Sequence, residues 1–349
     1  MIKIEDHIIH QDENIKTAMT RLNRLAGRLT LFVINDENKL TGTLTDGDIR
    51  RGLIAGKTIE QKVKDFMYPH FRYIMENNID VFKIKQYREQ SLKLLPVINQ
   101  EGKITKIIDL THTRTCLPVD AVIMAGGRGE RLRPLTDTLP KPLLKLGDKS
   151  ILEHNLSLLS YYGIEDIYIT VNYLAEKIRQ AIGNDAGKGL RIKYIQENQP
   201  MGTLGAVSLI NDFKHKVTLV MNSDLFTNID LEEMFQTLEE EKADAVVATV
   251  PYNIDIPFAV FEVRDNHITS LHEKPTYTYH TNAGIYLFRT ALFKYLPSHQ
   301  RCDVTDYLQI LLQHHCKIVK FPVLGYWMDI GRMEDYKKAQ EYYKYLQIR

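Results

Sequence analysis

The residues best suited to chemistry lie in the segment 121–142, which reads AVIMAGGRGERLRPLTDTLPKP. Its first four residues are apolar and predict a short buried strand, which Gly126, Gly127 and Gly129 then break. Because glycine has no Cβ, the backbone N–H groups of such a turn approach a ligand closely. Successive N–H groups there form a concave nest that binds anions. The turn is therefore a candidate site for a negatively charged ligand.

Basic side chains follow the glycines. Arg128, Arg131 and Arg133 come first, and Lys141 stands between two prolines that stiffen its segment. Arginine binds phosphate through two parallel hydrogen bonds, and lysine adds a compact positive charge. Glycine turn and cations together predict a cradle for a polyphosphate.

Two common phosphate-binding loops do not fit this segment. A Walker loop needs a Gly-Lys-Ser/Thr triplet after four spacer residues, and segment 121–142 has none. The dinucleotide fingerprint needs a third glycine, but Gly129 is followed by Glu130, Arg131 and Leu132.

The segment does resemble the signature of sugar-1-phosphate nucleotidylyltransferases, Gly-Gly-x-Gly-x-Arg-Leu-x-Pro-Leu-Thr followed by Pro-Lys-Pro. Every position matches but one, since Glu130 stands where the family often carries threonine. The resemblance implies catalytic roles for Arg131 and Lys141. It also implies that the turn binds the nucleotide through Ala125, Gly126, Gly127 and Gly129.

Two aspartates are the candidate metal ligands. Asp224 follows an apolar strand predicted at 217–221, so its carboxylate faces the same sheet edge as the glycine turn. Asp329 lies in Trp-Met-Asp-Ile-Gly, which resembles the family's late Trp-x-Asp-Ile-Gly element, although Arg332 stands where relatives frequently have threonine. Mg²⁺ usually takes one or two protein carboxylates together with phosphates and water. We therefore expect Asp224 and Asp329 to hold Mg²⁺.

Two further elements resemble the family's sugar-recognition segments. Glu273-Lys274-Pro275 offers an acceptor for sugar hydroxyls and, in Lys274, a cation for the sugar phosphate. The segment 282–286, Asn-Ala-Gly-Ile-Tyr, offers the Asn282 amide, which both donates and accepts. The resemblance implies a catalytic role for Lys274 and sugar binding by Glu273, Asn282 and Gly284.

The segment 197–206, ENQPMGTLGA, resembles the family's Pro-Leu-Gly-Thr-Ala-Gly element, with departures at Met201 and Leu204. The resemblance implies that Glu197 and Gly202 bind the nucleotide. Gly202 would let backbone groups meet the edge of the base, and Glu197 could accept from the paired N–H donors of guanine. An acidic residue here also occurs in uridylyl and thymidylyl enzymes, so the base stays open between them.

The surrounding pattern predicts a Rossmann-like α/β domain at 119–349, with a mixed but mostly parallel sheet. A boundary falls near 113–119, where polar residues and Pro118 precede the strand of the glycine turn. The predicted strands are 167–171, 191–195, 217–221 and 245–250, and the predicted helices are 151–162, 175–181, 205–210, 231–241 and 333–346.

Residues 1–115 contain a weak internal repeat, in which 31–49 and 95–111 each predict strand, turn, strand and helix. They resemble a pair of cystathionine-β-synthase (CBS, or Bateman) modules, which implies an α+β domain. The first module keeps Thr45 and Asp48, which often hold a nucleotide ribose in that family, whereas Asp109 and His112 replace them in the second. Asp48 could also serve only as a helix cap. The pair is therefore either a site for an adenine or guanine nucleotide or a dimerisation and packing module.

Composition excludes several other functions. Among the 349 residues there is no apolar run of membrane-spanning length, the N-terminus does not resemble a secretory signal, and the three cysteines are scattered. We therefore expect a cytoplasmic protein without membrane contact. The net charge of +1 gives no indication of a nucleic-acid partner. His314, His315 and Cys316 lack further ligands at suitable spacing, so we do not expect a metal there.

These observations favour an enzyme that joins an NTP and a sugar 1-phosphate to give an NDP-sugar and pyrophosphate. The resemblance is closest to guanylyltransferases of bacterial surface-glycan pathways that act on mannose- or glucosamine-1-phosphate, and we expect a homo-oligomer. One alternative is a uridylyl- or thymidylyltransferase acting on glucose-1-phosphate. Another is a nucleotide-sensing regulator with an inactive transferase domain.

Overall fold

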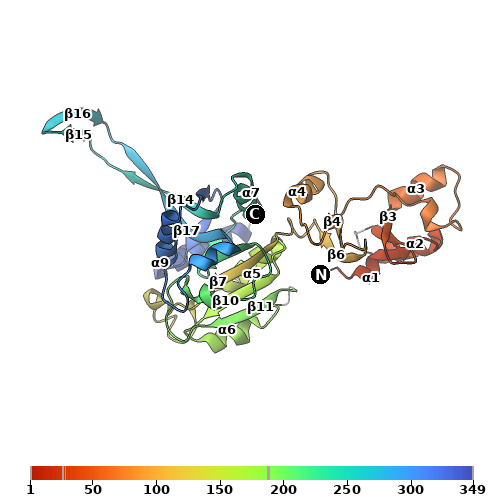
Figure 1. The fold of residues 1–349 in the computed structure, drawn as a ribbon, viewed down its shortest axis with the longest axis horizontal. Helices are drawn as coiled ribbons and strands as arrows, with labels where there is room; N and C mark the ends of the chain where they lie inside the picture. The colour runs from red at the N-terminus through yellow and green to blue at the C-terminus, as the bar shows by residue number, and fades with distance from the viewer. Residues whose placement is uncertain (1, 26, 28, 187–188, 348–349) are drawn as a thin grey trace. The chain divides into compact units, whose positions relative to one another are not determined.

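A computed structural model describes residues 2–25, 27, 29–186 and 189–347 (Figure 1). Backbone contacts divide the chain into two compact units. Unit 1 comprises residues 1–118 and 160–164, and unit 2 comprises 119–159 and 165–349. None of the helices among the described residues is long and apolar enough to cross a membrane.

Unit 1 contains two successive β-α-β-β modules, each with a three-stranded sheet. In each sheet the first strand runs parallel to the second, and the second and third pair antiparallel with a bulge. Apolar side chains from both sheets, including Phe32, Leu94 and Ile107, form one buried cluster. The first module comprises β1 (Ile8–His10), α2 (Ile15–Arg24), β2 (Thr30–Ile34), β3 (Leu40–Thr45) and α3 (Asp46–Ile54), after a short α1 (Ile4–His7). The second comprises β4 (Ile74–Met75), α4 (Val81–Glu89), β5 (Leu94–Ile98) and β6 (Ile104–Asp109).

One expectation for the second module is wrong. The repeat predicts a helix after its last strand, but β6 is followed by a turn. The Asp109 carboxylate accepts hydrogen bonds from the Thr111 N–H (3.1 Å) and the Thr111 hydroxyl (2.5 Å). Such a local side-chain turn offers the backbone an alternative to a helix. The first module keeps its helix because Thr45 and Asp48 cap α3.

Unit 2 is built around a seven-stranded sheet with the order β11-β10-β7-β12-β17-β14-β18. Strands β11, β10, β7 and β12 run parallel to one another, and β17 is antiparallel to both of its neighbours. This mixed, mostly parallel α/β sheet confirms the predicted fold class. The strands are β7 (Val119–Met124), β10 (Asp166–Val171), β11 (Arg191–Gln196), β12 (Val217–Asn222), β14 (Ala245–Asp255), β17 (Thr276–Arg289) and β18 (Ile318–Pro322).

Helices complete this unit (Figure 1). Asp230 caps α7 by accepting from the Glu232 and Glu233 N–H groups, both at 3.0 Å, and the apolar side of that helix is buried. The segment predicted as a helix at 205–210 is a 3₁₀ turn, Gly205–Leu209. The helices are α5 (Ile151–Tyr161), α6 (Ala175–Ile182), α7 (Leu231–Glu240), α8 (Val304–Gln313) and α9 (Met333–Gln347). Small two-stranded sheets pair β8 (Lys145–Leu146) with β9 (Lys149–Ser150) and β13 (Leu225–Thr227) with β19 (Trp327–Asp329).

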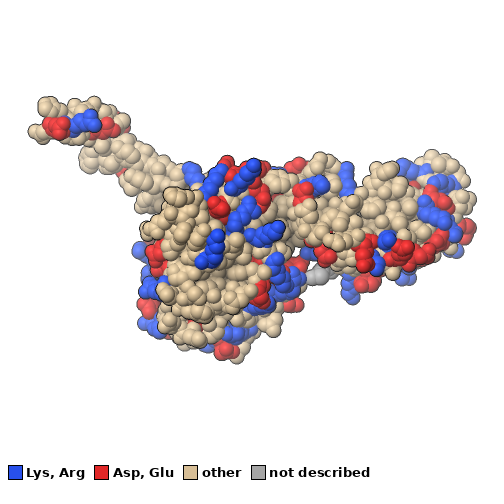
Figure 2. Space-filling view, in the orientation of Figure 1, with Lys and Arg blue, Asp and Glu red and all other residues tan. Residues whose placement is uncertain are grey.

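A ribbon of two antiparallel strands projects from the large sheet (Figure 1). It consists of the distal parts of β14 and β17 and of the hairpin β15 (Val260–Arg264) with β16 (His267–His272). The predicted strand at 245–250 is thus longer than expected, because β14 runs on to Asp255. In Figure 2 the shaft of the ribbon is mostly uncharged, and charged residues gather at its tip. Large apolar side chains such as Tyr252, Phe258 and Ile268 are exposed along it.

Candidate active site

A cavity of about 550 Å³ opens where the parallel strands of unit 2 end. The glycine turn follows β7, Asn172 follows β10, Glu197 follows β11 and Asp224 comes two residues after β12. These four strands are neighbours in the sheet, so the residues after them lie together at the carboxyl ends of the strands. Of the predicted site residues, the cavity is lined by Gly126, Gly127, Gly129, Arg131, Lys141, Glu197, Gly202 and Asp224. Ala125 lies beside them but is buried.

The glycine turn owes its shape to Gly129. This residue has φ +64°, a left-handed conformation that favours glycine, and it precedes a 3₁₀ turn at Glu130–Leu132 that carries Arg131. A Cβ at Gly129 would lie 3.0 Å from Thr136 Cγ2 and 3.1 Å from Lys141 Cβ. The Thr136 hydroxyl closes the arrangement by donating to the Gly129 carbonyl at 2.8 Å. The turn and the Lys141 segment are therefore packed directly against each other.

Lys141, Asp224 and Asp329 form one charged group. The Lys141 ammonium donates to Asp224 Oδ2, and β19 brings Asp329 opposite Leu225, the neighbour of Asp224. The Ile330 N–H donates to the Asp224 carbonyl at 3.0 Å, which ties the two segments together. Burial, together with the charge of Asp224, raises the pKa of the Asp329 carboxyl, against the lowering effect of Lys141 and Arg131.

The two aspartates suit a divalent cation. Asp224 Oδ1 is buried and has no hydrogen-bond partner among the described residues. An uncompensated buried carboxylate oxygen is costly, and a hard cation such as Mg²⁺ compensates it with the ligand type it prefers. The neighbouring Asp329 supplies a second carboxylate in an environment that disfavours its charge until a cation arrives. The donor set therefore fits the predicted metal site.

Glu197 forms the wall opposite the aspartates. Its side chain is 7% exposed, and its Oε2 accepts from the Met201 N–H at 3.2 Å. Burial raises the pKa of Glu197, against the lowering effect of the Met201 N–H and of the neighbouring Asn172 and Thr170 side chains. A Cβ on Gly126 would lie only 2.4 Å from Glu197 Oε1. The glycine turn and the base-recognition segment therefore meet at this carboxylate.

The Asn282 segment lies beside the cavity but does not line it. Asn282 is exposed, its amide donates to the Tyr286 hydroxyl at 2.6 Å, and its Oδ1 accepts from the Gly284 N–H at 2.9 Å. Gly284 has φ +71°, and a Cβ there would lie 2.6 Å from Asn222 Nδ2. Asn222 lines the cavity and Gly284 does not, so Gly284 packs against a residue of the cavity wall without facing the cavity itself.

Glu273 and Lys274 are not brought to the cavity. Both are exposed and lie between β16 and β17 on the projecting ribbon. Their predicted roles in sugar binding and catalysis stay predictions.

The structure adds residues that sequence reasoning missed. Asn172 directly follows β10, and Ser223 directly follows the last residue of β12, Asn222; both line the cavity. Their place at the carboxyl end of a predicted strand could have indicated a role in the site. Asp303 also lines the cavity, yet it lies a hundred residues beyond Thr203, its hydrogen-bond partner, and nothing in its local sequence pattern indicates the contact.

In unit 1, the predicted ribose residues form a helix cap. Thr45 Oγ1 accepts from the Asp48 N–H, while Asp48 Oδ2 accepts from the Thr45 N–H at 2.8 Å and hydroxyl at 2.6 Å. Asp48 Oδ1 accepts from Arg51 at 2.6 Å. The reciprocal capping box and the Arg51 contact together occupy both carboxylate oxygens of Asp48. Even so, Asp48 and Arg51 border a cavity of about 520 Å³.

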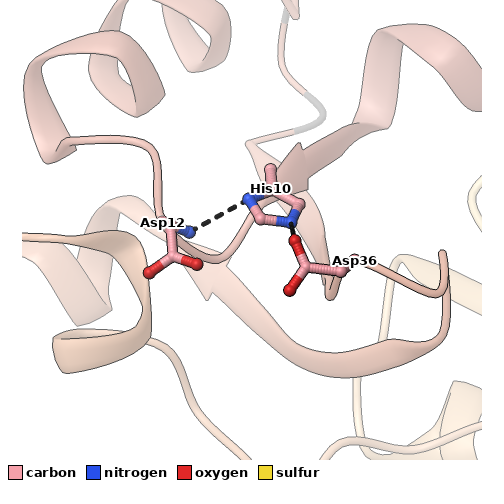
Figure 3. A group of neighbouring side chains, drawn as sticks. All are labelled: His10, Asp12 and Asp36. Atoms are coloured by element: carbon pink, nitrogen blue, oxygen red, sulfur yellow. Dashed lines mark hydrogen bonds and ion pairs between the residues drawn. The ribbon is translucent and has the colours of Figure 1, made fainter.

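Two other clusters have metal-ligand side chains. His10, Asp12 and Asp36 converge in unit 1, where His10 contacts Asp36 at 3.2 Å and accepts from the Asp12 N–H at 3.3 Å (Figure 3). Lys62 and Lys64 both pair with Asp12 Oδ1, at 2.8 and 2.9 Å, and lower the pKa of Asp12 to about 2. These ammonium groups already neutralise the carboxylate that a metal would need.

The second cluster consists of Asp120, Asp166 and His215. Asp120 is the second residue of β7 and Asp166 the first residue of β10, so the cluster lies at the end of the strands opposite the cavity. Asp166 accepts from Arg191 at 2.7 and 2.8 Å and from Lys214 at 2.5 Å. Two fixed cations thus occupy this carboxylate, and we assign no metal to the cluster.

The chain belongs to the nucleotidyl transferase family, whose model matches residues 120–345, the part that holds the cavity. A CBS domain model matches residues 4–55, the first module of unit 1. The two matches confirm the resemblance to nucleotidylyltransferases and, for the first module of unit 1, the resemblance to CBS domains. That the second module is also a CBS domain stays a prediction.

Two relatives match the chain over a little under two thirds of its length. The chain is 29% identical over 227 residues to mannose-1-phosphate guanylyltransferase of Mycobacterium tuberculosis, covering 63% of each chain. It is 32% identical over 232 residues to the bifunctional protein GlmU of Methanocaldococcus jannaschii, covering 64% of this chain and 54% of that one. The chain thus spans about half to two thirds of the length of these relatives.

Two shorter proteins match over nearly their whole length. The D-glycero-alpha-D-manno-heptose 1-phosphate guanylyltransferase of Aneurinibacillus thermoaerophilus is 30% identical over 230 residues, which are 64% of this chain and 97% of that one. The crystal structure of HddC from Yersinia pseudotuberculosis superimposes with a TM-score of 0.52 at 25% identity, covering 64% of this chain and 99% of that one.

Proposed function

We propose that this protein transfers a nucleoside monophosphate from an NTP to a sugar 1-phosphate and releases pyrophosphate. The observation that carries the proposal is the joint presence, around one cavity, of the glycine turn, Arg131, Lys141 and Asp224, with Asp329 held next to Asp224 by the pairing of β13 with β19. These are the components that phosphoryl chemistry requires: N–H donors, fixed cations and ligands for a divalent metal.

The chemistry needs positioning more than proton transfer. The sugar phosphate is largely dianionic near neutral pH, because its second pKa is about 6. Its oxygen attacks the α-phosphorus, the bond to the β-phosphate oxygen breaks, and pyrophosphate leaves with that electron pair. Lys141, held by Asp224, offsets negative charge at the cavity, and Arg131 offers a planar pair of donors to the departing pyrophosphate. A divalent ion held by Asp224 and Asp329 would supply Lewis-acid neutralisation of the phosphates.

GTP is the leading nucleotide, with mannose- or glucosamine-1-phosphate as the acceptor. Glu197 places a buried carboxylate in the cavity wall, where it can accept from the N1–H and 2-amino groups of guanine. Two relatives bear guanylyltransferase names. Uridylyl transfer to glucose-1-phosphate is the second candidate, because a Synechocystis protein that is 29% identical to this chain is named UTP–glucose-1-phosphate uridylyltransferase.

Sugar recognition is assigned to Glu273, Lys274, Asn282 and Gly284. For the first two to act, the ribbon must fold toward the cavity, since both are exposed in the extended arrangement. Lys274→Ala should then raise the KM for the sugar phosphate about tenfold and leave the KM for the nucleotide unchanged. Arg264→Ala, at the exposed end of the same ribbon, is the matched control. Equal KM values for both variants and the wild type would remove Lys274 from the site.

We propose a CBS pair over residues 1–115 and a catalytic domain over residues 119–349. The CBS pair associates copies of the chain and binds at most one adenine or guanine nucleotide. The cavity beside Asp48 and Arg51 supports a ligand, whereas the capping box supports a packing role. Calorimetric titration of the full chain with each nucleotide, without sugar phosphate, compares the wild type with Asp48→Ala, and only the binding that the substitution removes is assigned to unit 1. Binding that survives the substitution places the nucleotide elsewhere.

The deciding experiment measures pyrophosphate release with four NTPs against a panel of sugar 1-phosphates in the presence of Mg²⁺. We expect the highest kcat/KM for GTP with mannose- or glucosamine-1-phosphate. Asp224→Asn and Asp329→Asn should each lower kcat by about 10²-fold. Release from no combination would favour the regulator with an inactive transferase domain.

A further inference from the structure

The segment before α8 packs against the back of the segment 201–205, which forms one wall of the cavity. The Cys302 carbonyl accepts from the Leu204 N–H at 2.9 Å and the Gly205 N–H at 3.1 Å, and the Cys302 N–H donates to the Met201 carbonyl at 3.0 Å. A Cβ on Gly202 would lie 2.7 Å from the Cys302 carbonyl oxygen. The two segments thus behave as one packed layer.

Asp303 supplies the side-chain contact in this layer. Its Oδ1 accepts from the Thr203 N–H at 2.9 Å and from the Thr203 hydroxyl at 3.4 Å. The Thr203 hydroxyl oxygen in turn accepts from the Val304 N–H at 2.9 Å. Asp303 and Thr203 both line the cavity, so this reciprocal link lies at the wall itself.

The position of Asp303 makes this use of its carboxylate informative. It is the N-cap residue of α8, where aspartate ordinarily accepts from the first N–H groups of the helix. Here its side chain makes no cap hydrogen bond and is directed to Thr203. The helix forgoes the side-chain cap that its N-cap aspartate ordinarily supplies, and its first N–H, that of Val304, donates to the Thr203 hydroxyl oxygen instead.

We propose that Asp303 is a positioning residue for the nucleotide: through Thr203 it holds the segment 201–205 in the conformation that receives the base. The inference rests on the proposed function. It predicts an effect on nucleotide binding alone, because Asp303 contacts neither the glycine turn nor the Lys141–Asp224 pair among the described residues. A preorganised wall lowers the cost of binding because the ordering is already present in the free enzyme.

The test compares four single variants and one double variant of the full chain by steady-state kinetics, nucleotide titration and thermal melting. Asp303→Ala should raise the KM and Kd for the accepted NTP about tenfold, with the sugar-phosphate KM and kcat changed less than about twofold. Asp303→Asn keeps an oxygen that accepts from the Thr203 N–H and should restore most of the affinity. Asp306→Ala, on an exposed aspartate of the same helix, is the matched control.

Thr203→Val removes the hydroxyl, with its hydrogen bonds to Asp303 and Val304, but keeps the backbone N–H that donates to Asp303. It serves if Asp303→Ala does not fold, and its own loss of NTP affinity should be the smaller one. In the double variant the loss should be less than the sum of the two single losses, because both substitutions remove the contact between the hydroxyl and the carboxylate. Additive losses, or an unchanged NTP affinity in folded Asp303→Ala, would overturn the inference. A wild-type chain that binds no NTP would instead refute the proposed function, so the two failures are distinguishable.

Discussion

Replacing Gly126 with alanine should weaken nucleotide binding by displacing Glu197. The added Cβ would stand 2.4 Å from Glu197 Oε1 and 3.1 Å from its Cδ, so the carboxylate must retreat by about 1 Å to reach ordinary van der Waals contact. It cannot retreat freely, because it is 7% exposed and accepts from the Met201 N–H.

Overpacking of this kind typically costs about 1–3 kcal/mol. For a unit of this size, that corresponds to a fall in melting temperature of roughly 3–9 °C. The KM for the NTP should rise about tenfold, because the base-recognition wall loses its fixed acceptor. Thermal melting and initial-rate kinetics on the same preparation measure both effects.

Gly127→Ala is the control in the same turn. Its added Cβ meets no atom within 4 Å, so stability should change by less than about 0.5 kcal/mol. Gly127 lines the cavity, so this variant should lose nucleotide affinity without losing stability. If Gly126→Ala melted and bound nucleotide like the wild type, the argument that Glu197 is fixed against the glycine turn would be refuted.

Three further predictions address other parts of the chain. Arg131→Lys keeps the charge but loses the two-pronged contact, so kcat should fall more than the NTP KM rises, with Arg133→Lys as control; a change in KM alone would make Arg131 a uniform binding group. Because the pKa of Asp329 is raised, Mg²⁺ affinity should decline in acid at a pH above the ordinary aspartate value of about 3.9, and the contribution of Asp329 to the stability of the metal-free protein should fall as the pH rises from that value through the raised pKa; isothermal titration, and the difference between the melting curves of the wild type and Asp329→Asn across pH, test both, and a difference that does not change with pH contradicts the second. Asp48→Ala should destabilise the protein by about 1 kcal/mol in chemical denaturation through loss of the α3 cap, and unchanged stability would contradict the capping role.

Much of the catalytic sheet could be predicted because its strands are buried on both faces and read as apolar runs. β10 and β12 lie within one residue of their predicted ends, and β7 ends where predicted but starts two residues earlier. Their order places the glycine turn and Asp224 at one end of the sheet. The charged group of Lys141, Asp224 and Asp329 could be predicted because Asp224 follows a strand and the other two residues belong to segments that resemble the family's motifs.

Other features could not be predicted because they depend on contacts between distant segments. β17 enters the sheet antiparallel, and its partners lie far away in sequence, so local periodicity does not reveal its direction. The Asp303–Thr203 bond joins residues a hundred positions apart. The helix predicted after β6 gave way to the Asp109 turn, since a short side-chain contact competes with helix formation.

In the proposed reaction the α-phosphorus of the NTP is transferred to the sugar phosphate. GTP radiolabelled at either the α- or the γ-phosphorus is supplied together with mannose-1-phosphate, and the label is followed by chromatography. We expect the α-label in the nucleotide sugar and the γ-label in pyrophosphate, and we expect Asp224→Asn to lose both transfers. Transfer of the γ-label to the sugar, or release of the γ-label as free phosphate, would contradict the proposed reaction.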